Sequence, residues 1–310
     1  MPFDIVTIGV VCADVMVYPI ERWPRPGELA LVPNIDARMG GLASVTASVA
    51  SQLGARTAFI GRLGNDLFGN FLNDELRRHN VETPMVRWDE TEGTSATIVT
   101  IDKSGERSFM HRVGATKNVT PADVDLGLLR GTKIFHWGGP AITPGLQGGP
   151  IGELFERVRA QGIATSIDTC FDGAGVWYPH IEHALPHTTI MMSSVEEARH
   201  YTGRQTDDEI ADFYLGHGAE TVLVKLGEEG VLAADRAERH RIPAHRVNVL
   251  DTTGAGDAAC GGFLYAYVKG WSLRDSAALA NAVGGLTVQA HGGAEAGVTL
   301  ARARQLAGLP

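Results

Sequence analysis

Strand-length apolar segments alternate with helical patterns along most of this chain. Strand patterns lie at residues 4–11, 57–60, 133–137, 163–167, 188–192 and 221–225, and helical patterns at 43–53, 67–79, 152–161, 195–202 and 207–216. Strands that are separated by helices in this way pair in parallel and are covered by helices on both faces. The sequence therefore predicts an α/β fold with a mostly parallel sheet. Ligands of such sheets bind beyond the carboxyl ends of the strands, where loops lead into helices.

Two segments interrupt this alternation. Residues 15–39 are strand-like but contain several prolines, and residues 94–111 alternate on both sides of Lys103, Ser104 and Gly105. The second pattern predicts a β-hairpin. Together the segments predict a small sheet outside the main one, and a simple hairpin at the edge of the main sheet is the alternative.

The charge of the chain argues against a polyanionic partner. Its 310 residues are enough for one large or two modest domains with an unassisted core. They carry 27 basic and 36 acidic side chains, a net charge of −9, and the basic ones are scattered. A nucleic-acid partner would need a concentrated basic face. We therefore expect a small-molecule ligand and no nucleic acid.

The cysteines and the first residues indicate where the protein works. Cys12, Cys170 and Cys260 are far apart and lack the paired spacing of a zinc site or of a disulfide framework, so we expect reduced thiols. The N-terminal segment has an acid where a signal peptide needs bases, and no apolar run approaches the ~20 residues of a membrane span. The expectation is a cytoplasmic protein without a membrane partner.

The segment Asp-Thr-Thr-Gly-Ala-Gly-Asp at residues 251–257 carries the clearest chemical signal. Gly254 and Gly256 flank Ala255, so the backbone can turn its N–H groups toward one point, and the helix that follows adds its positive dipole end. This arrangement favours an anion such as phosphate. Because like charges repel, the Asp257 carboxylate is better explained as a base that accepts the proton of an attacking hydroxyl. The segment predicts phosphoryl transfer to an alcohol, with the amides of Gly254, Ala255, Gly256 and Asp257 as the anion hole.

Two plainer interpretations compete with this one. The segment could be a capping turn at a helix start, or Gly254, Gly256 and Ala259 could belong to a dinucleotide-binding fingerprint. The fingerprint belongs after an early strand, with an acidic residue about 20 positions further on, and helical sequence follows here instead. Phosphoryl transfer therefore remains the leading hypothesis.

The same segment resembles the C-terminal signature of the ribokinase-like (PfkB) carbohydrate kinase family. The resemblance extends from Gly9 to about Gly293 through landmarks in the family's order: Asp14 after an early strand, Gly40-Gly41 before a helix, residues 61–69, and residues 224–230. It implies one ribokinase-like kinase domain over residues 1–310, a three-layer α/β/α sandwich with a small β lid. The lid would comprise segments at about 15–39 and 94–112.

The resemblance also implies roles for individual residues. Asp14, Gly40, Gly41 and Arg112 match positions that face the sugar in relatives. ATP would be bound by Ser194, Glu197, Lys225, Gly227, Gly230 and Asn281, with Mg²⁺ near Glu197. A monovalent cation such as K⁺ is expected near Asp251, Thr253 and the loop at 290–293. A homodimer formed through the lid is a further expectation, because exposed sheet edges invite a partner.

Several positions depart from the family pattern and bear on the substrate. Val45 stands where relatives usually have asparagine, and Leu42 replaces a lysine expected in ribokinases and in kinases of phosphorylated hexoses. Ser194 replaces asparagine in the Asn-x-x-Glu motif. The loop at 251–257 and the resemblance together imply an ATP-dependent kinase for a hydroxyl, a primary one, of a monosaccharide or related polyol.

Three alternatives stay open. A nucleoside kinase of the same family would need a slot for the base, for which Phe109, Trp137 and Trp177 are candidates. A binding regulator without turnover is motivated by Val45 and Ser194. A dehydrogenase is the third, although the glycine fingerprint lies late in the chain.

Overall fold

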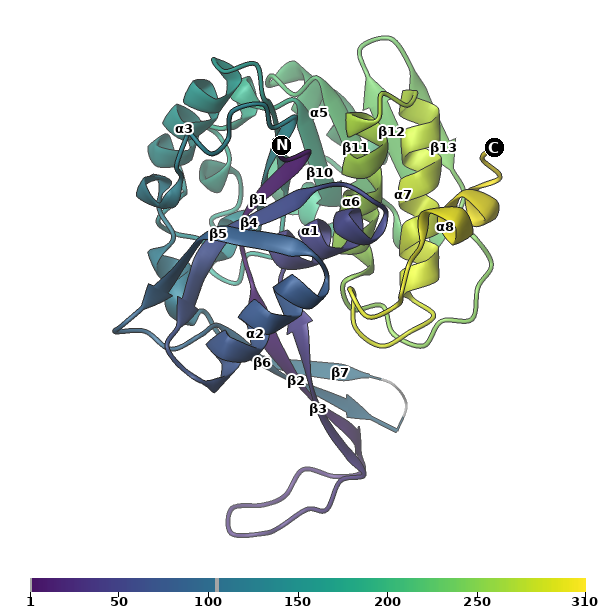
Figure 1. Ribbon diagram of the computed structural model, residues 1–310. Helices are drawn as coiled ribbons and strands as arrows, with labels where there is room; N and C mark the ends of the chain where they lie inside the picture. Colours follow the sequence, from purple (N-terminus) through teal and green to yellow (C-terminus); the bar gives the residue numbers. More distant parts are fainter. Residues whose placement is uncertain (1, 104–105) are drawn as a thin grey trace.

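A nine-stranded sheet forms the centre of the molecule, in the order β13-β12-β11-β10-β9-β8-β1-β4-β5. The computed structural model describes every residue except 1 and 104–105 (Figure 1). The strands are β1 (Ile5–Gly9), β4 (Thr57–Gly64), β5 (Val81–Asp89), β8 (Ile134–Gly138), β9 (Ala164–Asp168), β10 (Ile190–Ser194), β11 (Thr221–Lys225), β12 (Val231–Asp235) and β13 (Arg239–Ile242). Every pair from β5 to β11 is parallel, and β12 and β13 are added in antiparallel fashion. This is the mostly parallel sheet that the alternation predicts.

Helices cover both faces of this sheet (Figure 1). They are α1 (Leu42–Gln52), α2 (Leu67–Arg78), α3 (Gly149–Arg159), α4 (Val195–Thr202), α5 (Asp207–Gly216), α6 (Ala255–Val268), α7 (Leu273–Thr287) and α8 (Leu300–Ala307). Short 3-10 turns lie at Gly114–Asn118, Pro121–Asp123, Pro140–Ile142, Tyr178–His180, Leu185–His187 and Gly227–Glu229. None of the helices in the described part of the chain is both long and apolar enough to cross a membrane.

The strands bury side chains on both faces. In β11, Val222 and Val224 join the hydrophobic layer under α3, α4 and α5, whereas Leu223 joins the layer under α1, α6 and α7. Successive side chains of a strand point to opposite faces, so both layers draw on β1, β8, β10, β11 and β12. The result is a three-layer α/β/α sandwich, which confirms the predicted fold class.

Element boundaries differ from the sequence-based ones at a few places. Strand β4 continues to Gly64 because it pairs with β5 as far as Asp89. Helix α3 begins at Gly149, because Pro150 fits the first turn of a helix, where its missing N–H is not needed.

A second sheet projects from the body of the molecule (Figure 1). It contains β2 (Cys12–Ile20), β3 (Asn34–Gly40), β6 (Ala96–Asp102) and β7 (Arg107–Arg112), in the order β3-β2-β6-β7. Both segments that interrupt the alternation lie in this sheet. The hairpin of β6 and β7 is antiparallel, as its pattern predicts, and the predicted turn residues Ser104 and Gly105 lie outside the described residues.

Candidate active site

The loop at 251–257 leads into α6 through a left-handed residue. Gly254 is the N-cap of α6 and has φ = 73°, a conformation that side chains with a Cβ rarely adopt. A Cβ on Gly254 would also lie 2.6 Å from Cα of Gly293. The turn therefore requires glycine. The Ala255 amide donates to the Thr252 carbonyl at 3.3 Å, and the N–H groups that follow in the first turn of α6 have no acceptor earlier in the helix.

Asp251 ties this loop to the loop at 290–293. One carboxylate oxygen accepts a hydrogen bond from the Thr253 amide at 2.8 Å, and the other accepts one from the Gly292 amide at 3.1 Å. The His291 ring nitrogen Nδ1 lies 3.7 Å from the second oxygen. Asp251 is buried. The two loops expected to hold a monovalent cation are thus joined by a buried carboxylate.

Asp257 lies in the first turn of α6, at the helix start predicted from the sequence. Burial, together with the nearby Asp168 and Glu197 carboxylates, raises the pKa of Asp257 to about 7, although Lys225 lowers it. A carboxylate with a pKa near neutrality can accept a proton from a hydroxyl and release it again. The acidity of Asp257 fits the role of a general base.

A small cavity of about 40 Å³ lies between the projecting sheet and the start of α6. It is lined by Asp14, Met16, Arg38, Met39, Gly40, Gly41, Val45, Val99, Thr253, Gly254, Asp257, Gly292 and Gly293. Three residues expected to bind substrate, Asp14, Gly40 and Gly41, therefore share a cavity with the expected base, Asp257. The strands β2 and β3 and the helix start meet there although they are distant in sequence.

Asp14 is fixed at the edge of this cavity by its neighbours on the sheet. The Cys12 thiol donates a hydrogen bond to its carboxylate at 3.2 Å, and burial raises the pKa of Asp14. A Cβ on Gly40 would lie 2.0 Å from an Asp14 oxygen. Gly41, the N-cap of α1, has φ = 107°, and a Cβ there would lie 2.5 Å from the carbonyl oxygen of Val10. The two glycines thus make room for Asp14 and for the turn into α1.

Arg112 does not line this cavity. It ends β7, its side chain is 62% exposed, and a guanidinium nitrogen lies 3.5 Å from Glu92. Its role in binding substrate stays a prediction.

Arg38 lines the cavity, and sequence reasoning missed it. It donates hydrogen bonds to the carbonyl oxygen of His291 and, at 3.4 Å, to Asp36, so it links β3 to the loop at 290–293. The period of two along β3 could have found Arg38, because that period places it on the same face as Gly40.

Ser194, Glu197 and Lys225, which are expected on the nucleotide side, lie at the carboxyl ends of β10 and β11. Ser194 and Glu197 form a capping box at the start of α4, and the Thr169 hydroxyl donates to Glu197 at 2.8 Å. Ser194 is paired with Lys225 across β10 and β11. The substitution of asparagine by Ser194 thus preserves the helix cap.

The remaining nucleotide-side residues follow β11 or lie on α7. Gly227 and Gly230 form the turn between β11 and β12. The Asn281 side chain on α7 donates to the Pro243 carbonyl at 2.8 Å, so it ties α7 to the segment after β13. Gly227 and Gly230 thus follow the carboxyl end of β11, and the role of all three residues in binding ATP stays a prediction.

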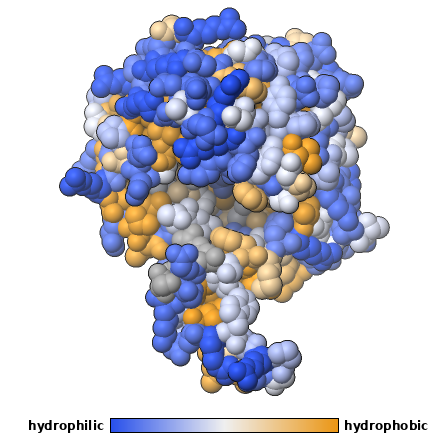
Figure 2. Space-filling model, turned by 180° about the vertical axis from the view of Figure 1, so that it is seen from behind, coloured by the Kyte–Doolittle hydropathy of each residue, from blue (hydrophilic) through white to orange (hydrophobic). Residues whose placement is uncertain are grey.

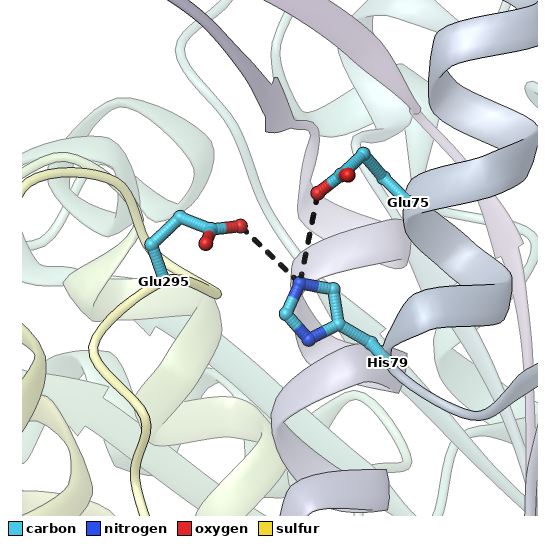
Figure 3. Close-up of side chains that lie close together, drawn as sticks. All are labelled: Glu75, His79 and Glu295. Carbon is cyan, nitrogen blue, oxygen red and sulfur yellow. Dashed lines mark hydrogen bonds and ion pairs between the residues drawn. The ribbon is translucent and has the colours of Figure 1, made fainter.

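A cluster of Glu75, His79 and Glu295 resembles a metal site by its donor atoms (Figure 3). The His79 ring nitrogen Nε2 lies 3.3 Å from Glu295 and 4.0 Å from Glu75. However, the Arg78 guanidinium contacts both carboxylates at 2.5 Å. A positive charge is already supplied by the protein, so the cluster is explained as a tie between α2 and the C-terminal region.

Comparisons with known proteins identify the family. The model of the pfkB family carbohydrate kinases matches residues 3–299. Probable fructokinase-4 of Arabidopsis thaliana is 29% identical over 281 residues, which cover 85% of this chain and 86% of that protein. The ribokinase of Staphylococcus aureus (strain COL) is 26% identical over 293 residues, covering 91% and 92% of the two chains.

A solved structure agrees over the full length. The structure of Arabidopsis thaliana ribokinase complexed with ribose and ATP has a TM-score of 0.86 and 26% identity, and the match covers 100% of both chains. The fold, the family match and the relatives give one answer. The chain belongs to the PfkB family of carbohydrate kinases, and it is a sugar kinase.

Proposed function

We propose that this sugar kinase transfers the γ-phosphoryl group of ATP to a hydroxyl, a primary one, of a monosaccharide or related polyol. The observation that carries the proposal is the shared cavity, in which Asp14 and Gly41 face Asp257 at the start of α6. The similar Arabidopsis ribokinase was solved with ribose and ATP, which supports the same pair of ligands here.

The substrate would lie in this cavity with its hydroxyls near Asp14. A carboxylate accepts hydrogen bonds from hydroxyl groups, and Gly40 and Gly41 permit a close approach of the backbone. Asp257 then accepts the proton of the attacking hydroxyl. Its pKa of about 7 allows it to do so near neutral pH.

The amides of Gly254, Ala255, Gly256 and Asp257 would stabilise the charge on the transferred group. These N–H groups belong to the N-cap and the first turn of α6, which the helix orients before any ligand arrives. The Ala255 amide also donates to the Thr252 carbonyl at 3.3 Å, so it would share its hydrogen between that carbonyl and the phosphoryl group. Lys225, whose ammonium group lies beside Gly256, adds a positive charge. The chain carries no Walker A lysine motif, and these groups would serve in its place.

The donor atoms at two places suit cations. The two hydrogen bonds that Glu197 accepts both use the Oε2 oxygen, and a carboxylate oxygen near the phosphates suits Mg²⁺ or one of its water ligands. Mg²⁺ that arrives with ATP would neutralise phosphate charge. Asp251 and Thr253, with the carbonyls of the loop at 290–293, would hold a monovalent cation such as K⁺.

We also propose that the sheet of β2, β3, β6 and β7 acts as a lid over the substrate and as a dimer contact. A lid excludes water, which in a kinase suppresses hydrolysis of ATP. The sheet and its loops expose large apolar side chains, among them Trp23, Leu29, Leu31, Ile35, Phe109 and Met110. Figure 2 shows hydrophobic residues on the part of the molecule that projects from the body. A second copy of the chain could cover them.

A sugar is favoured over a nucleoside. Of the three aromatic residues that could form a slot for a base, Trp137 is buried in the core, Phe109 is 59% exposed, and Trp177 stacks on His200. None of them is among the described residues that line the cavity. A cytoplasmic location stays a prediction, which three unpaired, buried thiols support.

The test is release of ADP from Mg·ATP across a panel of monosaccharides, polyols, sugar acids and nucleosides. We expect turnover with one sugar or polyol, and loss of that turnover in Asp257→Asn. Asp275→Asn, the same change in the first turn of α7, is the matched control. Turnover confined to a nucleoside would show that the substrate is a nucleoside and not a sugar or polyol. Saturable ATP binding without any turnover would favour a regulator.

A further inference from the structure

A buried ion pair between Asp168 and Lys225 lies next to the first turn of α6. The Lys225 ammonium nitrogen is 2.6 Å from an Asp168 carboxylate oxygen, and the two side chains are 13% and 0% exposed. Asp168 ends β9 and Lys225 ends β11, on the two sides of β10. Both side chains therefore lie at the edge of the sheet where ligands of this fold class bind.

Stability alone does not account for such a pair. Removing two charges from water costs several kcal/mol per ion, and well-packed apolar residues of similar volume are often as stable or more stable. The second carboxylate oxygen of Asp168 is buried and has no hydrogen-bond partner among the described residues. The pair is therefore better explained by what it does at the site.

The position of the ammonium group indicates that function. A Cβ on Gly256 would lie 3.3 Å from the Lys225 nitrogen, so this nitrogen rests against the first turn of α6. An ammonium group has three N–H donors. One reaches Asp168, and a second reaches the Cys260 sulfur at 3.6 Å. The third has no acceptor among the described residues, and it is available to a ligand beside the amides of the proposed anion hole.

The pair also faces the expected base. The charged and titratable groups around Asp257 come from several elements: Asp14 on β2, Asp168 on β9, Glu197 on α4, Lys225 on β11, and the thiols of Cys12 and Cys260. Asp168 raises the pKa of Asp257 and Lys225 lowers it, whereas Asp168 helps to keep Lys225 protonated against the effect of burial. The ion pair and the base thus share one electrostatic environment.

We propose that Asp168 is a positioning residue of phosphoryl transfer, which holds the Lys225 ammonium group against Gly256, where negative charge develops on the transferred group. This inference rests on the proposed kinase function. In the transfer, the hydroxyl oxygen of the sugar bonds to the γ-phosphorus, and the bond from this phosphorus to the β–γ bridging oxygen breaks. ADP leaves, the hydroxyl proton passes to Asp257, and Lys225 keeps its own proton.

The test compares the full-length wild type with Asp168→Asn in three measurements: kcat against pH, KM for the sugar, and the affinities for ADP and a non-hydrolysable ATP analogue. Without Asp168 we expect kcat to fall about 10- to 100-fold while KM for the sugar changes little. The acid limb of the kcat profile should move to lower pH by about half a unit or more, because one negative neighbour of Asp257 is gone. Affinity for the analogue should fall several-fold while affinity for ADP stays the same.

Asp172→Asn is the matched control. Asp172 is a buried acid that lies four residues further on, and it binds the amides of Val176 and Trp177 and the His180 ring. This change should lower stability and leave the pH profile unaltered. If Asp168→Asn folds poorly, the double variant Asp168→Asn/Lys225→Met removes both charges and should recover the melting temperature without recovering kcat.

The outcomes separate this inference from the kinase assignment. A wild type that turns over sugar, with an Asp168→Asn variant whose pH profile and nucleotide affinities are unchanged, overturns the inference and leaves the kinase intact. If the wild type shows no turnover and Asp168→Asn selectively weakens binding of the ATP analogue, the kinase assignment is wrong. The proposal that Asp168 holds Lys225 beside the nucleotide is then still supported. Failure of the wild type to bind either nucleotide overturns both.

Discussion

The Thr46 hydroxyl donates a hydrogen bond to the main-chain carbonyl oxygen of Asp257 at 3.0 Å. Thr46 lies on α1, which begins directly after the glycine pair proposed to face the substrate, and Asp257 lies in the first turn of α6. The bond therefore joins α1 to the helix that carries the proposed base.

Replacement of Thr46 by valine should lower kcat, although it should reduce the free energy of unfolding only slightly. The change keeps the shape of the side chain and removes one hydrogen bond, worth about 1 kcal/mol. We expect kcat to fall about 3- to 10-fold, since small displacements of a catalytic group are costly. Ser48→Ala is the control, because the Ser48 hydroxyl is buried on the same helix and has no hydrogen-bond partner in the described part of the chain. Equal kcat values for the two variants would contradict the role of the bond.

Gly254 should not tolerate alanine. Both Gly254 and Gly297 have left-handed backbones, so alanine costs about 1–2 kcal/mol at either position. Only at Gly254 would the new methyl group clash with Gly293, whereas nothing lies within 4 Å of the corresponding position at Gly297. We expect Gly254→Ala to lose more stability than Gly297→Ala in urea unfolding and to lose most of its kcat. Similar losses in both variants would show that backbone strain alone matters.

The fold could be predicted from the sequence because its signals are local and repeated. The Thr221–Lys225 strand is apolar at every buried position, and helix starts carry caps such as Ser194 and Thr206. The ends of strands and helices are predicted less accurately than their existence. Strand β4 extends through Gly61 and Gly64 because of its pairing with β5, and pairing between strands is not written in a local pattern.

The site could be predicted only in part. The loop at 251–257 contains both glycines and the base in one short segment, so its chemistry is local. The Asp168–Lys225 pair cannot be read from a local segment. The two residues are 57 positions apart in the sequence, and the strand order of the sheet brings them together. For Arg38 the period of two along β3 gives the face that it shares with Gly40, whereas its contact with the loop at 290–293 depends on the packing of β3 against that loop.

Asparagine at position 45, the residue usual in the family, should destabilise the protein without substrate. Val45 is 1% exposed and lines the cavity, and a buried amide without partners costs about 1–3 kcal/mol. A saturating sugar should recover part of this loss in the melting temperature of Val45→Asn, because the amide could then bond to a hydroxyl. Val49→Asn, one turn further along α1 and inside the core, should show no such recovery. If the sugar raises the melting temperatures of both variants equally, position 45 does not contact the sugar.

Chelators should not affect the cluster of Glu75, His79 and Glu295. Arg78 pairs with both carboxylates and offsets part of their charge, so we expect EDTA to leave the melting temperature unchanged. Arg78→Met should lower the free energy of unfolding by about 1 kcal/mol, because two carboxylates then face each other in a partly exposed network. Arg77→Met, at the neighbouring exposed position, is the control. A drop in melting temperature on chelation would instead indicate a bound metal.

Asp257→Asn should be inactive yet more stable than the wild type above neutral pH. The pKa of Asp257 is raised from 3.8 to about 7 in the folded protein, so the folded state binds this proton more tightly than the unfolded state does. The stabilisation from that proton is complete below pH 3.8 and is lost as the pH rises toward 7. The unfolding free energy of the wild type should therefore decline across this range relative to that of Asp257→Asn.

At pH 8 the variant should be more stable by about 1–4 kcal/mol, with a smaller difference at pH 5. Urea unfolding of both proteins at pH 5, 6, 7 and 8 measures this difference, and Asp275→Asn in the first turn of α7 is the control for the substitution itself. A gap between wild type and Asp257→Asn that stays constant with pH would mean that Asp257 is already ionised at pH 5. Its carboxylate would then be a weaker base than the proposed mechanism requires, and the acid limb of kcat would have to come from another group.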